Sequence, residues 1–180
     1  MLNRRNLLIG SGTILGVGGL ASLSFAKSDP KTDPKSNPLL EANMKVDNDT
    51  EWAKLSESEW KDRLTDMEYY VLRKEGTERA GTSPLDKEYR KGTFVCAGCA
   101  LPLFTSDMKY DSGTGWPSFF TVIDGAVGTK EDNKLWAKRT EYHCARCGGH
   151  QGHVFGDGPR PTGLRYCNNG VALDFIPDEA

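Results

Sequence analysis

The sequence predicts a mainly β domain that follows N-terminal helices and is stapled by a four-cysteine zinc site. Three observations lead to this class. Beyond Lys91 the chain consists of short runs rich in Val, Phe, Tyr and Thr, broken at close intervals by Gly, Pro and Asp, which is typical of short strands. Before that point, apolar residues recur as in amphipathic helices. Two Cys-x-x-Cys pairs lie within the β region.

Length and charge limit the function classes. With 180 residues the chain is long enough for one domain with its own core. Its 23 Lys and Arg against 25 Asp and Glu give a net charge of −2, which offers no broad attraction to nucleic acid or anionic lipid. We therefore expect no nucleic-acid partner.

The first 26 residues have the pattern of an export signal. Arg4 and Arg5 precede a Gly-rich apolar run that ends in small residues at Ala26, as in secretory signal peptides. The paired arginines are similar to the twin-arginine class. We expect residues 1–26 to be a twin-arginine-like signal peptide and the protein to be exported to the periplasm, without stable membrane association after cleavage. A general secretory signal and an uncleaved anchor are the alternatives.

The next segment, 27–49, contains three turn-forming triplets that end in Pro30, Pro34 and Pro38 and has little to bury. It is predicted to be a disordered linker. The folded domain is therefore expected over 50–180.

Within this domain each region has its own pattern. The spacing of apolar residues over 50–74 predicts one or two short helices, and 76–89 is expected to be a loop. The predicted strands are 92–96, 119–123, 135–142, 153–155, 164–168 and 171–175.

Four of the five cysteines form the predicted metal site. The pairs are Cys96 with Cys99 and Cys144 with Cys147, and two tight turns of this kind brought together give the tetrahedral thiolate set that suits zinc. We expect one structural zinc per chain, because no ligand position is left open for catalysis. We expect the first turn to depend on Gly98. Two structural disulfides, or a disulfide oxidoreductase acting through these pairs, are the alternatives.

The fifth cysteine, Cys167, is left free and has chemically active neighbours. On a strand, Arg165, Cys167 and Asn169 would share one face, and a fixed cation near a thiol favours the thiolate. His150 and His153 lie shortly upstream, and a turn at Gly152 would let both imidazoles reach the same pocket and exchange protons there. The alternative for Cys167 is an inert buried thiol. His143, beside Cys144, is expected outside this group.

Several stretches closely resemble the peptide-methionine (R)-S-oxide reductases. They are Asp-Ser-Gly-Thr-Gly-Trp-Pro-Ser-Phe at 111–119, Gly-His-Gln-Gly-His-Val-Phe at 149–155 and Arg-Tyr-Cys-Asn-Asn at 165–169, with Tyr-Tyr-Val-Leu-Arg at 69–73 and Gly-Thr-Glu at 76–78. The resemblance implies two small antiparallel sheets, a structural zinc distant from the active site, and a reductase domain over 50–180.

The resemblance also implies roles for individual residues. Cys167 would attack the sulfur of methionine-R-sulfoxide, free or in an oxidised protein, and become a sulfenic acid in the course of protein repair. The polar groups that handle protons around it would be His150, His153 and Asn169. Trp116 would pack on the S-methyl group of the substrate, supported by Asp157 and Arg165.

Two positions depart from the family pattern. Many members have a second cysteine where this chain has Thr114, so we expect an external thiol to reduce Cys167 directly. The run Gly170-Val-Ala-Leu173 replaces the usual Ser-Ala-Ser-Leu, a change expected to affect only packing. The alternative from another functional class is a zinc-stapled binding module in which Cys167 is incidental.

Overall fold

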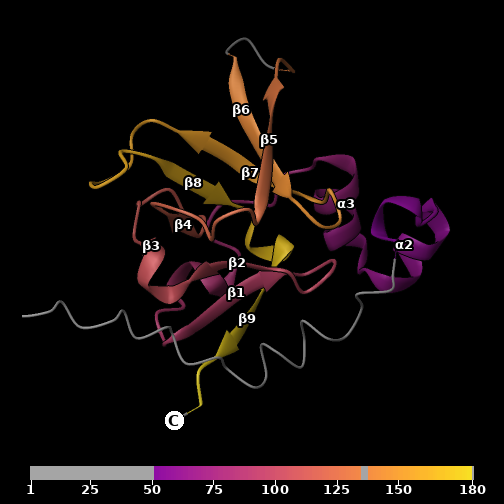
Figure 1. The fold of residues 1–180 in the computed structure, drawn as a ribbon, viewed down its shortest axis with the longest axis horizontal. Helices are drawn as coiled ribbons and strands as arrows, with labels where there is room; N and C mark the ends of the chain where they lie inside the picture. The colour runs from indigo at the N-terminus through magenta and orange to yellow at the C-terminus, as the bar shows by residue number, and fades with distance from the viewer. Residues whose placement is uncertain (1–50, 135–137, 180) are drawn as a thin grey trace, which may run out of the picture. The chain divides into compact units, whose positions relative to one another are not determined.

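The computed structural model describes residues 51–134 and 138–179, so the predicted signal peptide and linker lie outside the described residues. The described part contains two antiparallel sheets with helices beside them, labelled in Figure 1. The predicted class, mainly β with two antiparallel sheets and N-terminal helices, is confirmed. Among the described residues, no helix has the length and apolar character needed to cross a membrane.

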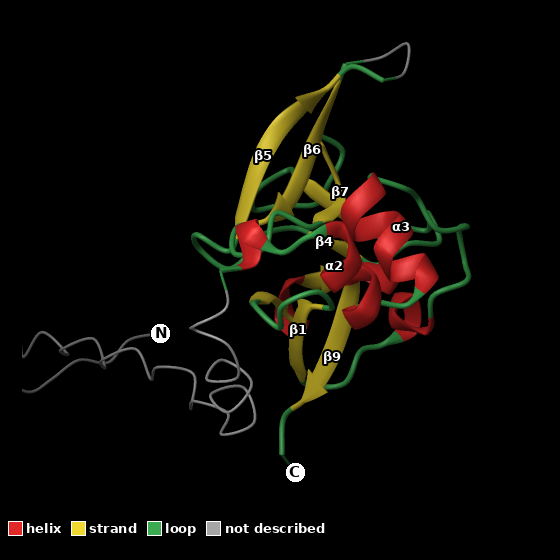
Figure 2. Ribbon diagram, turned by 90° about the vertical axis from the view of Figure 1, so that its right-hand side faces the viewer, coloured by secondary structure: helices red, strands yellow, loops and turns green. Residues whose placement is uncertain are grey.

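The N-terminal helices form where the apolar spacing predicted them. A 3-10 turn, η1 (Trp52–Lys54), precedes α2 (Glu57–Arg63) and α3 (Asp66–Lys74). Both α-helices begin with capping boxes, because Ser56 pairs with Glu59 and Thr65 with Glu68. The buried side chains of α2 and α3 are Trp60, Val71 and Leu72, and Figure 2 shows the two helices side by side.

The strands divide between the two sheets. The three-stranded sheet has the order β2 (Pro102–Thr105), β1 (Gly92–Cys96), β9 (Leu173–Pro177). The six-stranded sheet has the order β3 (Lys109–Tyr110), β4 (Ser118–Phe119), β8 (Arg165–Asn168), β7 (His150–Phe155), β6 (Arg139–Cys144), β5 (Val127–Asp132). Strands β5 and β6 form the hairpin at the top of Figure 2.

An aromatic cluster connects the two sheets. Phe104 of β2 stacks on Phe119 of β4 with 3.9 Å between ring centroids, and Phe94 of β1 contacts Phe119 edge-on at 5.1 Å. Tyr142 of β6 closes the cluster against Phe104. All four residues have no exposed surface, so burial of their rings is a main source of stability for the packing of one sheet on the other.

Each of the six predicted strand regions overlaps a strand of the structure, but several boundaries were wrong. Strand β1 matches the predicted 92–96, whereas the strand predicted over 119–123 ends at Phe119 and the one predicted over 171–175 begins only at Leu173. The first residues of the strand predicted over 171–175 belong instead to a 3-10 turn, η4 (Gly170–Ala172). The turn forms because the Glu78 carboxylate accepts hydrogen bonds from the amides of Gly170 and Val171.

Three strands were not predicted. Strand β5 carries consecutive charged residues at 130–132 on an exposed hairpin, so it lacks the apolar alternation that marks a half-buried strand. Strand β2 begins at a proline, and β3 has only two residues. The predicted loop at 76–89 is loop apart from a short 3-10 turn, η2 (Pro84–Lys87).

Candidate active site

Cys167 lies on β8 between two partner strands of the six-stranded sheet. It pairs directly with His153 of β7 on one side and with Ser118 of β4 on the other. Residues that face each other across antiparallel strands have their Cβ atoms about 4.5–5.5 Å apart and their side chains on the same face. The sheet register therefore places an imidazole beside the Cys167 thiol.

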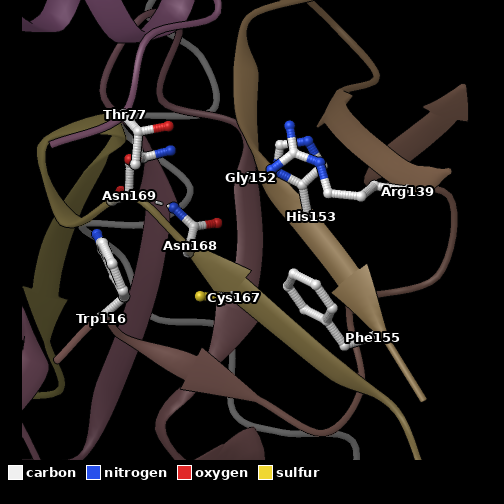
Figure 3. A pocket seen from close by; sticks show the side chains of 9 residues that line it. All are labelled: Thr77, Trp116, Arg139, Gly152, His153, Phe155, Cys167, Asn168 and Asn169. Atoms are coloured by element: carbon white, nitrogen blue, oxygen red, sulfur yellow. Dashed lines mark hydrogen bonds between the residues drawn. The ribbon is translucent and has the colours of Figure 1, made fainter. Parts of the chain in front are cut away.

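A cavity of about 130 Å³ opens beside this pair. Figure 3 shows Cys167 between Trp116 on one side and His153 with Phe155 on the other. The full lining consists of Thr77, Trp116, Arg139, Gly152, His153, Phe155, Cys167, Asn168 and Asn169. Two aromatic walls around a thiol and an imidazole suit a small substrate that is partly apolar and partly polar.

Burial raises the pKa of the Cys167 thiol above its ordinary value. The charge of Arg165 and hydrogen bonds from Thr114 and Arg165 act in the opposite direction but are outweighed. The sequence correctly predicted the direction of the Arg165 effect. It did not show that burial dominates, or that Arg165 already makes two hydrogen bonds of 2.9 Å to Asp157.

His153 is held by a carboxylate from the neighbouring hairpin. Its Nε2 lies 2.7 Å from Oδ2 of Asp132, at the end of β5. Arg139, at the start of β6, donates to the same oxygen at 2.5 Å. Hydrogen bonds from the Lys134 main chain, His153 and Arg139 hold the pKa of Asp132 well below its ordinary value, so this carboxylate is charged at neutral pH.

His150 lies behind His153 and does not line the cavity. Its Nδ1 is 2.8 Å from Oε1 of Glu141, the two imidazole rings are 5.5 Å apart, and burial lowers its pKa. Among the described residues, no group lies within hydrogen-bond distance of its Nε2. A protonated His150 is therefore disfavoured by its surroundings.

The two imidazole rings lie 5.5 Å apart, but the prediction that both reach the pocket of Cys167 was wrong for His150, and a bulge rather than a turn at Gly152 brings the rings together. A bulge in the β6–β7 pairing places His143 opposite His150 and Tyr142 opposite Gly152, so β7 has one extra residue there. Gly152 itself is not a turn. A Cβ at this position would lie 1.9 Å from the carbonyl oxygen of Cys167, so the glycine allows β7 and β8 to approach each other. His143 lies on β6, outside the cavity lining.

Asn169 and Trp116 are both tied to Glu78. The Glu78 main-chain amide donates to Asn169 Oδ1 at 3.0 Å, and its carbonyl accepts from Trp116 Nε1 at 3.2 Å. Asn169 Nδ2 also donates to the carbonyl of Gln151 at 2.9 Å. Glu78 is buried, and its side chain caps η4. One residue of the predicted loop therefore positions both the aromatic wall and the amide next to Cys167.

Asp157 and Arg165 lie at the edge of this group. Neither lines the cavity. The Arg165 guanidinium lies 4.3 Å from the centre of the Phe155 ring, and Asp157 fixes the guanidinium through two hydrogen bonds. Their structural effect is thus to support an aromatic wall, and the charge of Arg165 also acts on Cys167.

The four remaining cysteines are positioned to hold a metal ion, apart from the cavity lining. Their sulfur atoms all lie within 4.8 Å of one another and are buried, and all four thiols are free. Cys96 ends β1 and Cys144 ends β6, so a metal ion here would connect the two sheets. In the first turn the left-handed residue is Ala100 with φ 55°, not Gly98 as the sequence suggested, and Gly148 with φ 68° is its equivalent in the second.

The structure brings four predicted residues to one cavity, namely Cys167, His153, Asn169 and Trp116. His150 and Arg165 each contact a lining residue, and Asp157 contacts Arg165. The carboxylates of Asp132 and Glu141 and the links made by Glu78 were missed. They are recognisable only once strand pairing and the loop path are known. Phe155 was also missed, although it ends the motif at 149–155. It lies two residues after His153 on β7, and this spacing places both side chains on the same face of the sheet.

Comparison with known proteins identifies the family of the chain. A family model described as "SelR domain" matches residues 64–177. The curated "Peptide methionine sulfoxide reductase MsrB" of Leptospira interrogans is 54% identical over 121 residues, 67% of this chain and 92% of the relative. The protein of the same name from Methanosarcina mazei is 52% identical over 125 residues, 69% and 89% of the two chains. "Peptide methionine sulfoxide reductase B1, chloroplastic" of Arabidopsis thaliana is 46% identical over 153 residues, 84% and 71%.

Proposed function

The chain belongs to the SelR-domain family, and from this membership and the geometry around Cys167 we propose that it is a peptide-methionine (R)-S-oxide reductase. It reduces methionine-R-sulfoxide, free or within oxidised proteins, to methionine. The observation that carries the mechanism is the direct pairing of Cys167 with His153 on adjacent strands beside the cavity.

The reaction moves one oxygen atom from the substrate to Cys167. The sulfur of Cys167 attacks the sulfoxide sulfur, and His153 passes the proton lost by the thiol to the sulfoxide oxygen. The bond between the oxygen and the substrate sulfur breaks as the protonated oxygen bonds to the Cys167 sulfur. The sulfur–sulfur bond formed by the attack breaks with its electron pair on the substrate, and methionine leaves. The substrate sulfur gains two electrons that Cys167 loses, and Cys167 remains as a sulfenic acid. A base beside the thiol is needed because burial keeps Cys167 protonated at rest.

The cavity walls orient the sulfoxide. Trp116 and Phe155 line it on opposite sides of Cys167 (Figure 3), and the S-methyl group packs on the Trp116 ring while the oxygen faces His153. The Trp116 ring is fixed by its hydrogen bond to Glu78. In this arrangement only one of the two epimers can present its sulfur to Cys167 and its oxygen to His153 at the same time.

The test compares the two epimers directly. With a small-molecule dithiol as reductant, we expect methionine to form from the R epimer and at most about 1% of that rate from the S epimer, because a misplaced oxygen loses the positioned proton donor, which contributes about 100-fold or more. Chromatography of the methionine product measures both rates. Equal rates, or faster reduction of the S epimer, would contradict the proposal.

We also propose that the metal held by the four cysteines is zinc and that it is structural. Thiolates at the usual zinc–sulfur distance of about 2.3 Å form a tetrahedron with edges of about 3.8 Å. The Cys96–Cys147 and Cys99–Cys144 sulfur pairs are 3.7 Å and 3.5 Å apart, close to that edge and far from a disulfide bond of about 2.0 Å. Gln151 and the Gly149 amide donate to two of the sulfur atoms, which supports thiolates.

An external thiol completes the cycle. One thiol attacks the Cys167 sulfenic acid and releases water, and a second releases Cys167 and leaves as the external disulfide. The direct route is supported by the surroundings of Cys167. Thr114 contacts it by a hydrogen bond, and the other four cysteines are buried together in the metal site.

The substitution Thr114→Cys should supply the missing internal thiol. Because position 114 is within hydrogen-bond reach of Cys167, the new thiol should condense with the sulfenic acid during the first turnover. Non-reducing peptide mapping would show a disulfide between positions 114 and 167. Thr129→Cys is the matched control, since Thr129 is exposed on β5, three strands from β8, and should form none. Absence of the disulfide in Thr114→Cys would contradict this account.

We further propose that residues 1–26 export the protein by the twin-arginine route, with 27–49 as a tether. This proposal is supported by Arg4 and Arg5 before the Gly-rich apolar run. It is also supported by the metal site, because a protein exported in the folded state loads zinc in a reducing compartment before its thiols meet oxidants.

Replacement of both arginines by lysine tests the route. Lysine keeps the charge but lacks the planar guanidinium, so Arg4→Lys with Arg5→Lys should leave the precursor in the cytoplasm. Cell fractionation and immunoblotting of precursor and mature forms measure the outcome. Lys27→Arg, just beyond the signal, is the matched control and should export normally. Unchanged export of the double variant would instead support the general secretory route.

A further inference from the structure

The β5–β6 hairpin supplies a carboxylate to each of the two histidines. Asp132 pairs with His153 at 2.7 Å, and Glu141 pairs with His150 at 2.8 Å. Only His153 lines the cavity. We propose that Asp132 is a positioning residue for the reduction: it holds His153 with the proton on Nε2 and thereby leaves Nδ1 as the nitrogen that exchanges a proton with Cys167 and the sulfoxide. This inference rests on the proposed reductase function.

The tautomer follows from the partners of Asp132. Its Oδ1 accepts from the Lys134 main-chain amide at 2.9 Å, and its Oδ2 accepts from Arg139 at 2.5 Å. Asp132 is 8% exposed and these donors stabilise its charged form. An ionised carboxylate can only accept hydrogen bonds. The contact with His153 Nε2 therefore requires that the nitrogen carry the proton.

The same contact fixes the ring in space. His153 of β7 and Cys167 of β8 face each other on adjacent strands. Asp132 contacts the His153 ring from β5, which is separated from β7 by β6. A carboxylate, an imidazole and a thiol are thus held in sequence by three separate strands of one sheet. Groups that hold an imidazole in this way act through its orientation and tautomer rather than by contact with the substrate.

The neighbouring Glu131 provides a matched comparison. It is the residue before Asp132 on β5, its side chain is 64% exposed, and its partner is the exposed Lys138. Removing its charge alters the same strand by the same chemical change without touching His153. An exposed pair of this kind contributes little to stability.

The experiment compares Asp132→Asn with Glu131→Gln in the full-length protein with bound metal. The amide introduced by Asp132→Asn can take two orientations. In one, its NH₂ group faces the Lys134 main-chain amide, and in the other it faces Arg139 and His153. Each orientation therefore sets a donor against a donor. We expect the single-turnover rate with methionine-R-sulfoxide to fall about 100-fold, the lower end of what a positioned acid or base contributes. The substrate concentration for half-maximal rate should change less than about threefold, as for a loss confined to the transition state. Glu131→Gln should match the parent protein.

A spectroscopic readout separates positioning from a structural role. The chain has three histidines, so nitrogen-15 spectra of the parent protein and of single histidine variants assign each ring. The resting parent protein should show His153 protonated at Nε2, with that proton protected from exchange, and Asp132→Asn should lose the protection while keeping its metal content and thermal unfolding midpoint.

Two outcomes would overturn the inference: a resting His153 protonated only at Nδ1, or an Asp132→Asn rate within about threefold of the parent value. If Asp132→Asn does not fold, the tautomer in the parent protein still decides. If the parent protein does not reduce the R epimer, the proposed function is wrong. The nitrogen-15 spectrum tests the contact between Asp132 and His153 independently of that result.

Discussion

Cys167→Ser is expected to lose reduction of methionine-R-sulfoxide by more than about 1,000-fold, or about 4 kcal/mol of transition-state stabilisation. A serine hydroxyl in the same position is a weak nucleophile and cannot store the oxygen as a sulfenic acid. The hydroxyl fits the site without a steric clash because it is smaller than the thiol. Methionine formation with excess reductant measures the loss.

The same variant serves as a test of the binding-module alternative. The metal content and thermal unfolding of Cys167→Ser should be close to those of the parent protein, since Cys167 lies outside the four-cysteine cluster. A folded Cys167→Ser that still reduces the sulfoxide at a comparable rate would show that another group is the nucleophile.

Cys99→Ser is expected to have the largest effect on stability. A structural zinc contributes about 10–16 kcal/mol of apparent binding free energy, while whole domains are stable by only about 5–15 kcal/mol. Cys99 is 6% exposed, and its sulfur lies 3.5 Å from that of Cys144. Loss of one ligand therefore removes the connection between the ends of β1 and β6 together with most of the binding energy.

Metal analysis and circular dichroism would measure this effect. The expected product is metal-free and poorly folded at ambient temperature. Cys167→Ser is the matched control, because it makes the same chemical change at the one thiol outside the cluster. A metal-free Cys99→Ser that is well folded and fully active would show that the site does not stabilise the fold.

The parts of the site that depend on residue type and spacing were predictable from the sequence. The two Cys-x-x-Cys pairs form one cluster, and Cys167 is the thiol that remains outside it. The motif that contains Trp116 meets the motif that contains His153 at one cavity. The helices at the N-terminus were visible from apolar periodicity, because their buried side chains recur on one face.

The parts that depend on strand pairing were not predictable. Asp132 and His153 are 21 residues apart, and their contact exists only because β6 brings β5 to β7. The convergence of His150 and His153 depends on a bulge that no local residue pattern marks. The role of Glu78 depends on the path of a loop that crosses to η4. Likewise, the dominance of burial over the charge of Arg165 at Cys167 is a property of the packed sheet.

The most direct test of Cys167 as oxygen acceptor is mass spectrometry of the protein after one turnover with methionine-R-sulfoxide and no reductant. We expect one added oxygen atom per chain, located on Cys167 and trapped by a sulfenic-acid reagent, with one methionine formed and the metal retained. A disulfide between Cys167 and any of the other four native cysteines, with the metal released, would contradict it, because a metal ligand would then be the resolving thiol.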